Sequence, residues 1–233
     1  MRMNFGEELG KEVEAILKTS WESRDGYVVP DTENIQLGND AVKLTGTVLY
    51  ADLADSSGLV ENHKDWFAAE VYKAYLVCAC RIIRHHGGEI TAFDGDRVMG
   101  VFIGETPNTS AAKAALRINW AVHELLRPKI KKNYPDITYT VKHGVGIDSS
   151  PLFIARSGIR GSNDLVWVGR AANVAAKLAA LREDGVSIYI TEVVFKKLQD
   201  SAKFSTKDKT LMWESRTWRG TTVYRSGWTW GIE

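Results

Sequence analysis

The chain has 233 residues, of which 44% are hydrophobic, and its 30 basic and 29 acidic residues give a formal net charge of +1. This composition supports one large hydrophobic core, and no block of like charge provides the basic surface that nucleic acids or anionic membranes require. The longest strongly apolar run, residues 74–80, is too short to span a bilayer, and residues 1–8 lack the apolar segment of a signal peptide.

The start of the chain is predicted to form an arm, which divides the sequence into residues 1–40 and a main domain over residues 41–233. Apolar residues recur at spacings of three and four over residues 4–22, which predicts an amphipathic helix. We expect this helix to pack against the main domain or a partner. A loop-rich bridge follows over residues 27–38.

The main domain alternates between strand and helix patterns. Strands are expected at residues 42–53, 89–93, 97–103, 138–148, 152–156, 164–168 and 186–190, with two more between residues 211 and 230, and helices at residues 62–86, 111–127, 170–181 and 192–198. Segment 152–156 is expected to form a hairpin with segment 138–148, and Pro128 to end or kink its helix. The order predicts an α+β fold with a ferredoxin-like sheet, helices on one face, and the other face open to a partner subunit.

The two cysteines, Cys78 and Cys80, lie two residues apart in a helical pattern and point to different faces. They form neither a disulfide scaffold nor a metal site alone, which is typical of the reducing cytoplasm.

Two aspartates occur where strands end. Asp52 leaves an apolar strand, and Asp96 lies in the turn Asp94-Gly95-Asp96 between two strand segments. If the intervening helix returns the chain beside its first strand, the two carboxylates converge. Two hard oxygen ligands at adjacent strand ends suit Mg²⁺ or Mn²⁺, the ions that bind triphosphates. Taken singly, each aspartate is more often a helix cap or a turn residue.

A third group of polar residues lies on the helix that is expected after Gly169. Asn173 and Lys177 are four residues apart and therefore share one face of that helix. They offer an amide and a cation at a fixed distance, although such a pair alone is most often a solvated surface.

Taken together, these segments resemble the ordered motifs of class III nucleotidyl cyclase catalytic domains. The resemblance covers roughly residues 42–224 and is carried by residues 49–53, 93–102, 144–147 and 168–178. It implies that Asp52 and Asp96, with the main-chain carbonyl of Leu53, bind two divalent cations, Mn²⁺ or Mg²⁺. No covalent nucleophile is required.

The resemblance also assigns the remaining polar residues. Asn173 matches the asparagine that orients the ribose, and Arg219 lies near a lysine that holds the terminal phosphates. Lys177 replaces an arginine that stabilises phosphate charge in the transition state. This chain therefore has a compact ammonium charge where the family has a planar guanidinium group with several donors. In the family each site combines two subunits head to tail, which implies a homodimer with two sites.

The positions that read the base in adenylate and guanylate cyclases lie four residues before Asp96 and seven before Asn173. Here they are Ala92 and Val166, whose side chains cannot hydrogen-bond a base edge. A regulatory domain without activity would also lose its metal aspartates, which this chain retains. An enzyme that acts on a different base would lose only the base readers.

Two further residues bear on the choice of base. Tyr50 lies on the strand face of Asp52 and narrows the pocket towards a pyrimidine. Arg97 can only donate hydrogen bonds and would favour uracil if it reaches the base, although strand alternation points it away from Asp96.

This combination resembles the pyrimidine cyclases of bacterial antiphage systems, whose products activate an effector protein. We therefore expect a uridylate cyclase that converts UTP to cyclic UMP. The alternatives are a cytidylate cyclase acting on CTP and a non-catalytic nucleotide-binding module.

Overall fold

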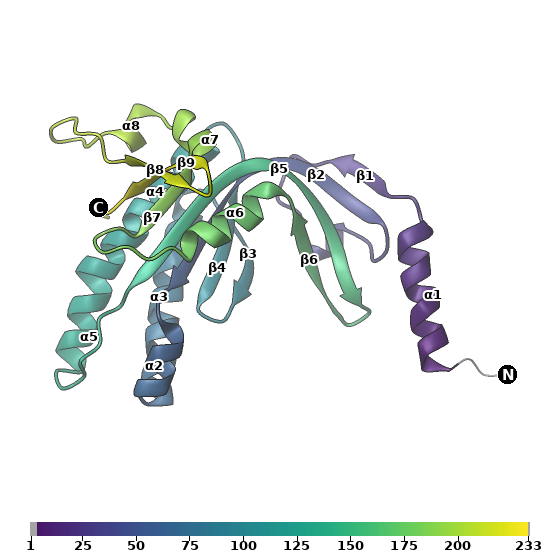
Figure 1. Cartoon of the computed structure of the whole chain (residues 1–233), viewed down its shortest axis with the longest axis horizontal. Coiled ribbons are helices and arrows are strands. Elements are labelled where there is room, and N and C mark those ends of the chain that lie inside the picture. Colours follow the sequence, from purple (N-terminus) through teal and green to yellow (C-terminus); the bar gives the residue numbers. More distant parts are fainter. Residues whose placement is uncertain (1–3, 233) are drawn as a thin grey trace. The chain divides into compact units, whose positions relative to one another are not determined.

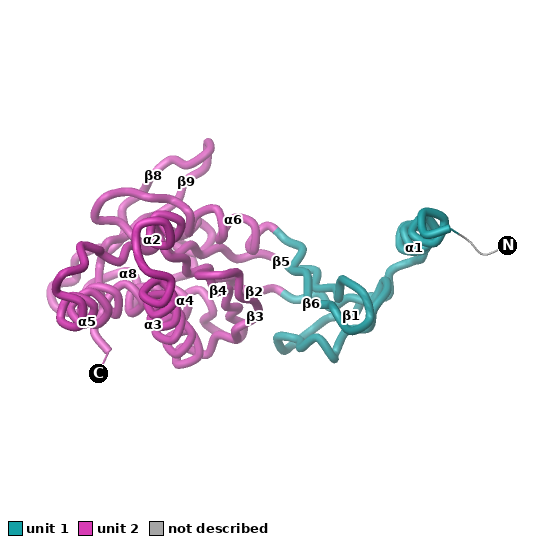
Figure 2. Tube along the Cα trace, turned by 90° about the horizontal axis from the view of Figure 1, so that it is seen from below, with its two compact units in different colours: residues 1–44, 151–169 teal, residues 45–150, 170–233 magenta. Residues whose placement is uncertain are grey.

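A computed structural model describes residues 4–232 and forms two compact units (Figure 2). The smaller unit contains residues 1–44 and 151–169, and the larger unit contains residues 45–150 and 170–233. No helix in the described part of the chain is long and apolar enough to cross a bilayer. The predicted domain boundary at residue 40 stays a prediction.

Helix α1 (Phe5–Lys18) of the smaller unit begins at a capping box, in which the side chains of Asn4 and Glu7 each accept the other's main-chain N–H. It ends before residue 22 because strand β1 (Glu22–Asp25) follows and pairs in parallel with the start of β2. None of the residues of α1 is buried. Its predicted packing against the main domain or a partner stays a prediction.

Strand β5 (His143–Ile159) is continuous where two separate strands were expected. Its last part pairs instead with β6 (Ser162–Val168) in an antiparallel hairpin. This pairing begins at Phe153, beyond Pro151, so the missing N–H of the proline costs no hydrogen bond to β6. The short 3₁₀ helix Thr32–Asn34 lies in the predicted bridge.

The strands of the larger unit follow the order β3-β4-β2-β5-β7-β9-β8. Besides β5, they are β2 (Asp40–Leu53), β3 (Glu89–Asp94), β4 (Arg97–Phe102), β7 (Ile188–Thr191), β8 (Glu214–Trp218) and β9 (Thr221–Ser226). Strands β5 and β7 run parallel, whereas β3, β4 and β2 pair antiparallel, as do β7, β9 and β8. This mixed sheet with its helices confirms the predicted α+β class (Figure 1).

The helices of the larger unit are α2 (Ser56–Asn62), α3 (Asp65–His85), α4 (Pro107–Trp120), a π-helical turn (Ala121–Leu126), α5 (Arg127–Asn133), α6 (Arg170–Ala179), α7 (Glu192–Lys196) and α8 (Asp200–Lys203). The helix that was expected to begin at residue 62 begins at Asp65. The extended backbone of His63 separates it from α2. Side chains of α3 and α4 bury one face of the sheet in a single cluster that includes Leu49, Val98 and Ile147.

Of the two predicted effects of Pro128, an end or a kink of its helix, the end is wrong. Pro128 lies in the first turn of α5, directly after the π-helical turn. In the π-helical turn the N–H of Arg127 bonds to the carbonyl of Val122, five residues back, so the hydrogen-bond ladder changes just before the proline and admits its ring. The helical path therefore continues to Asn133.

Helix α6 lies on the sheet face opposite α3 and α4. Along β7, Ile188 and Ile190 belong to the main cluster, whereas Tyr189 packs with Leu178 of α6 in a second cluster. Alternate residues of a strand point to opposite faces, so these clusters lie on opposite sides of the sheet. The prediction that the helices cover only one face of the sheet is therefore wrong, because α6 covers part of the other face.

Two glycines of β5 allow α6 to approach closely. A Cβ atom on Gly146 would lie 2.1 Å from the carbonyl oxygen of Ala175 and 2.5 Å from the main-chain nitrogen of Ala179. One on Gly144 would lie 2.1 Å from the carbonyl oxygen of Ala179. Real Cβ atoms do not come so near to backbone atoms, so this packing requires glycine.

Replacing Gly146 by alanine is therefore expected to lower the free energy of unfolding by on the order of 2 kcal/mol or more, since α6 or β5 must shift to admit the methyl group. Urea denaturation followed by circular dichroism measures this change. Ala180→Val provides the control, because Ala180 is exposed just beyond α6 and should change stability by less than about 0.5 kcal/mol. A Gly146→Ala protein as stable as the parent would contradict the close packing.

Candidate active site

The structure brings Asp52 and Asp96 together at one end of neighbouring strands. Asp52 of β2 pairs directly with Arg97, the first residue of β4, and Asp96 precedes that residue in the turn. The negative charge of Asp96 also acts on Asp52 and contributes to its raised pKa. The predicted convergence of the two carboxylates is thus confirmed, and it follows from the antiparallel pairing of β2 with β4.

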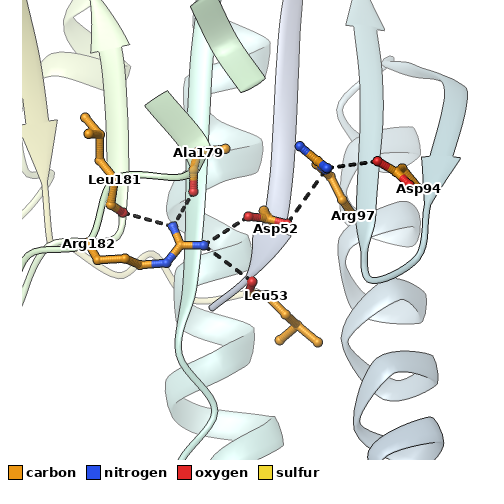
Figure 3. A network of polar contacts seen from close by, with 7 residues as sticks. All are labelled: Asp52, Leu53, Asp94, Arg97, Ala179, Leu181 and Arg182. Carbon is orange, nitrogen blue, oxygen red and sulfur yellow. Dashed lines mark hydrogen bonds and ion pairs between the residues drawn. The ribbon is translucent and has the colours of Figure 1, made fainter. Parts of the chain in front are cut away.

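Two arginines flank Asp52 (Figure 3). Arg182 donates from Nη2 to Oδ2 of Asp52 at 3.0 Å and to the main-chain oxygen of Leu53 at 3.4 Å. The Nε atom of Arg97 lies 3.9 Å from Oδ1 of Asp52, and its Nη2 donates to Asp94 at 2.8 Å. The carboxylate of Asp52, near the end of β2, therefore has a guanidinium group on each of two sides.

The environment of Asp52 changes its acidity. Burial raises the pKa of this carboxyl, the hydrogen bond from Arg182 lowers it, and the nearby charge of Asp96 raises it again. Two carboxylates that share one site repel each other when both are ionised. A bound cation would offset both the cost of burying the ionised carboxylate of Asp52 and its repulsion from Asp96.

The residues at this end of the sheet fit a divalent cation. The carboxylates of Asp52 and Asp96 and the carbonyl of Leu53 are hard oxygen donors. The Oδ2 atom of Asp96 is buried and has no hydrogen-bond partner among the described residues, which is costly unless a cation meets it. Within residues 4–232 no group of three or more His, Cys, Asp or Glu side chains could hold a metal. The ligand set therefore suits Mg²⁺ or Mn²⁺, which accept few protein ligands and complete their shell with phosphate oxygens and water.

The predicted base-pocket residues Tyr50 and Ala92 lie beside this carboxylate end. Both pair with Met99 of β4, so the three residues form one row on one face of the sheet. The next row on that face holds Asp52, Arg97 and Asp94. Tyr50 is half-buried, and this burial raises its pKa.

Asn173 and Lys177 lie on α6, as the sequence predicted. Both are exposed and share one face of the helix, four residues apart. The hydroxyl of Ser150 accepts the main-chain N–H of Ala171 at 2.9 Å and so caps the first turn of α6. The helix is therefore fixed both at its first turn and along its contact with Gly146.

No protein-family model matches the chain. A uridylate cyclase of Xanthomonas perforans is 48% identical to it over 235 residues, which covers 99% of this chain and 100% of that protein. A uridylate cyclase of Burkholderia cepacia is 44% identical, again over 99% of this chain and 100% of that protein. The chain belongs to the uridylate cyclase family.

Solved structures show that this cyclase has the class III fold. A bacterial light-regulated adenylyl cyclase superposes with a TM-score of 0.66 at 24% identity, over 79% of this chain and 90% of that chain. The adenylyl cyclase CyaB from P. aeruginosa superposes with a TM-score of 0.63 at 20% identity, over 80% of this chain and 95% of that chain. The resemblance drawn from the motifs is therefore confirmed.

Two other predicted site residues of this cyclase belong to β6 and to the turn between β8 and β9. Val166 belongs to β6 in the smaller unit, where it pairs with Ala155 and is 41% exposed. Arg219 occupies the turn between β8 and β9 in a left-handed conformation, with its guanidinium 5.1 Å from the centre of the Trp218 ring. That hairpin forms the edge of the sheet opposite β3. The roles of both residues stay predictions.

Arg182 is the residue of this cyclase site that sequence reasoning missed. It lies beyond the last turn of α6, in a segment without periodicity, and it reaches Asp52 across 130 positions of sequence. No local pattern could have signalled this contact. It depends on the way the sheet places β2 near the end of α6.

Proposed function

We propose that this cyclase converts UTP to 3′,5′-cyclic UMP and pyrophosphate with the help of two divalent cations. The observation that carries the proposal is the meeting of Asp52 and Asp96 beside the carbonyl of Leu53, with one carboxylate oxygen left buried and without a partner among the described residues. Such an oxygen set suits the cations that accompany nucleoside triphosphates.

The choice of UTP rests on two further observations. The relatives that match the whole chain at 48% and 44% identity are both named uridylate cyclase. Ala92, at one of the two purine-reading positions, lies one row from Asp52 and offers no side-chain hydrogen bond. Tyr50 lies in the same row, where its ring would reduce the space for a large base. Arg97 faces Asp52 and Asp94, and its contact with uracil stays part of the proposal.

The reaction needs one bond to form and one to break. The ribose 3′-oxygen attacks the α-phosphorus, its proton passes to solvent, and the bond from the α-phosphorus to the β-phosphate oxygen breaks to release pyrophosphate. When bound, the two cations would lower the pKa of the 3′-hydroxyl and neutralise charge on the leaving pyrophosphate. Asp52, Asp96 and the carbonyl of Leu53 would hold them.

The second half of each site would come from a partner subunit. Asn173 and Lys177 project to solvent from α6, so each could reach a nucleotide held by another copy of the chain. Asn173 would orient the ribose, and Lys177 would face the negative charge of the phosphoryl oxygens. Arg219 would hold the terminal phosphates. A head-to-tail homodimer then contains two sites.

The product would serve as a second messenger for a separate effector protein in antiphage defence. This part of the proposal rests on the resemblance to bacterial pyrimidine cyclases and requires no direct contact with the effector.

A panel of nucleotides tests the proposal. The purified chain is incubated with ATP, GTP, CTP or UTP and Mn²⁺, and the products are identified by mass spectrometry. Cyclic UMP is expected to exceed every other cyclic nucleotide by at least about tenfold, since the base contributes on the order of 1–3 kcal/mol of discrimination. Cyclic AMP or cyclic GMP as the main product would refute the pyrimidine assignment. Cyclic CMP would show a cytidylate cyclase, and nucleotide binding without pyrophosphate release a non-catalytic module.

A further inference from the structure

Arg182 lies against two of the three oxygens that we assign to the divalent cations. Its Nη2 is 3.0 Å from Oδ2 of Asp52 and 3.4 Å from the main-chain oxygen of Leu53 (Figure 3). The guanidinium thus supplies positive charge where the cation would bind. The inference that follows rests on the proposed function, because it takes these oxygens as metal ligands.

The same guanidinium is anchored on its other side. Its Nη1 donates to the main-chain oxygen of Leu181 at 2.9 Å and also to that of Ala179, the last residue of α6. Carbonyls at the end of a helix have no partner within the helix, and a cation is favourable there. These contacts place the guanidinium beside Asp52 in the metal-free chain.

The other nearby arginine is held less closely. Arg97 approaches Asp52 only to 3.9 Å, and its direct hydrogen bond goes to Asp94 at 2.8 Å. It therefore leaves the lone pairs of Asp52 accessible. Arg182 alone of the two makes hydrogen bonds to the ligand oxygens.

We propose that Arg182 is a resident counter-cation of the metal site, which pairs with Asp52 and Leu53 in the metal-free chain and withdraws when a divalent cation binds. A divalent cation needs the same oxygen lone pairs at about 2.0–2.2 Å. Two cations on one carboxylate oxygen also repel each other. Arg182 therefore lowers the affinity of the nucleotide-free protein for its metal.

The structure provides room for the withdrawal. The side chain of Arg182 is 38% exposed, and it lines an open cavity of about 350 Å³ on the larger unit. Asp184 lines the same cavity and offers a carboxylate to the displaced guanidinium, whereas Glu183 already pairs with Arg225. Arg127 and Lys142 also line this cavity, so the displaced side chain would turn to the Asp184 side of it. The hydrophobic cluster beneath the sheet need not rearrange, because Arg182 is not part of it.

Binding of Mn²⁺ to the nucleotide-free protein tests this proposal. Free Mn²⁺ is measured by electron paramagnetic resonance for the parent chain, Arg182→Ala and Arg182→Gln. Both variants remove the charge, and glutamine keeps an amide donor for the carbonyls at the end of α6, so it decides the outcome if the alanine variant fails to fold. We expect each folded variant to bind Mn²⁺ at least about tenfold more tightly. Unchanged or weaker binding in folded Arg182→Gln would overturn the proposal.

Two further variants separate this inference from the proposed function. Arg216→Ala removes a surface arginine that pairs with Glu214 at 3.4 Å, and it should leave Mn²⁺ binding unchanged. A tenfold gain in this control as well would overturn the proposal, because it would show a general effect of protein charge. Asp52→Asn should abolish the binding. If Asp52→Asn has no effect, the metal site itself is wrong. If binding requires Asp52 but ignores Arg182, only the counter-cation role fails.

Discussion

Replacing Asp96 by asparagine is expected to lower the synthesis of cyclic nucleotide by about 1000-fold or more. The substitution keeps the shape of the side chain and removes its charge. The buried Oδ2 of Asp96 has no other partner among the described residues, so its proposed ligand is the cation. Losing several kcal/mol of transition-state stabilisation from the cations corresponds to this factor.

The rate of product formation with Mn²⁺ and UTP, measured by mass spectrometry, checks this expectation. Asp65→Asn is the matched control, because Asp65 is an exposed aspartate in the first turn of α3. It should retain nearly full activity. If Asp96→Asn is folded and keeps a third or more of the parent rate, Asp96 is not a metal ligand.

Two inactive variants are expected to restore activity when they are mixed. Asp52→Ala damages the metal half of the site, and Asn173→Ala damages the half carried by α6. In the proposed homodimer, each change inactivates both sites. After subunit exchange, a mixed dimer holds one site with both lesions and one site with none. Random exchange should therefore return roughly a quarter of the parent activity, from half of the dimers with one of two sites intact.

The matched control mixes Asp52→Ala with Asp96→Ala. Both lesions then lie in the metal half, so every site of the mixed dimer is damaged and no activity should return. Exchange is verified independently with differently tagged subunits. If the first mixture stays inactive after proven exchange, the site is built within one chain, and the proposed head-to-tail dimer is wrong.

The meeting of Asp52 and Asp96 could be predicted from the sequence because its signals are local. Asp52 ends an apolar run and Asp96 lies in a short turn between two strand patterns. Antiparallel pairing of β2 with β4 then brings Asp52 and Asp96 close to each other. The shared helix face of Asn173 and Lys177 could be predicted equally well, since helical spacing alone places them on one face.

The parts that could not be predicted depend on tertiary context. Pro128 continues a helix because a π-helical turn precedes it. Pro151 lies within β5 because the hairpin to β6 begins only beyond it. Arg182 meets Asp52 because the sheet brings the end of α6 near the end of β2. For the two prolines the residue type taken alone favours a different local structure, and the surrounding chain overrides that preference. For Arg182 no local pattern signals the contact at all.

The close packing of α6 on Gly144 and Gly146 has an entropic consequence for substrate binding. The helix backbone lies too near β5 to admit a methyl group, so it cannot tilt or slide towards the strand. In the proposed complex, the conformational freedom that Lys177 loses on contacting a nucleotide is that of its own side-chain torsions, on the order of 0.5–1.5 kcal/mol. No ordering of backbone adds to that cost, which would otherwise be about 1–2 kcal/mol per residue. A helix held this firmly lets one amide and one ammonium group act at a defined distance even though both are exposed to solvent.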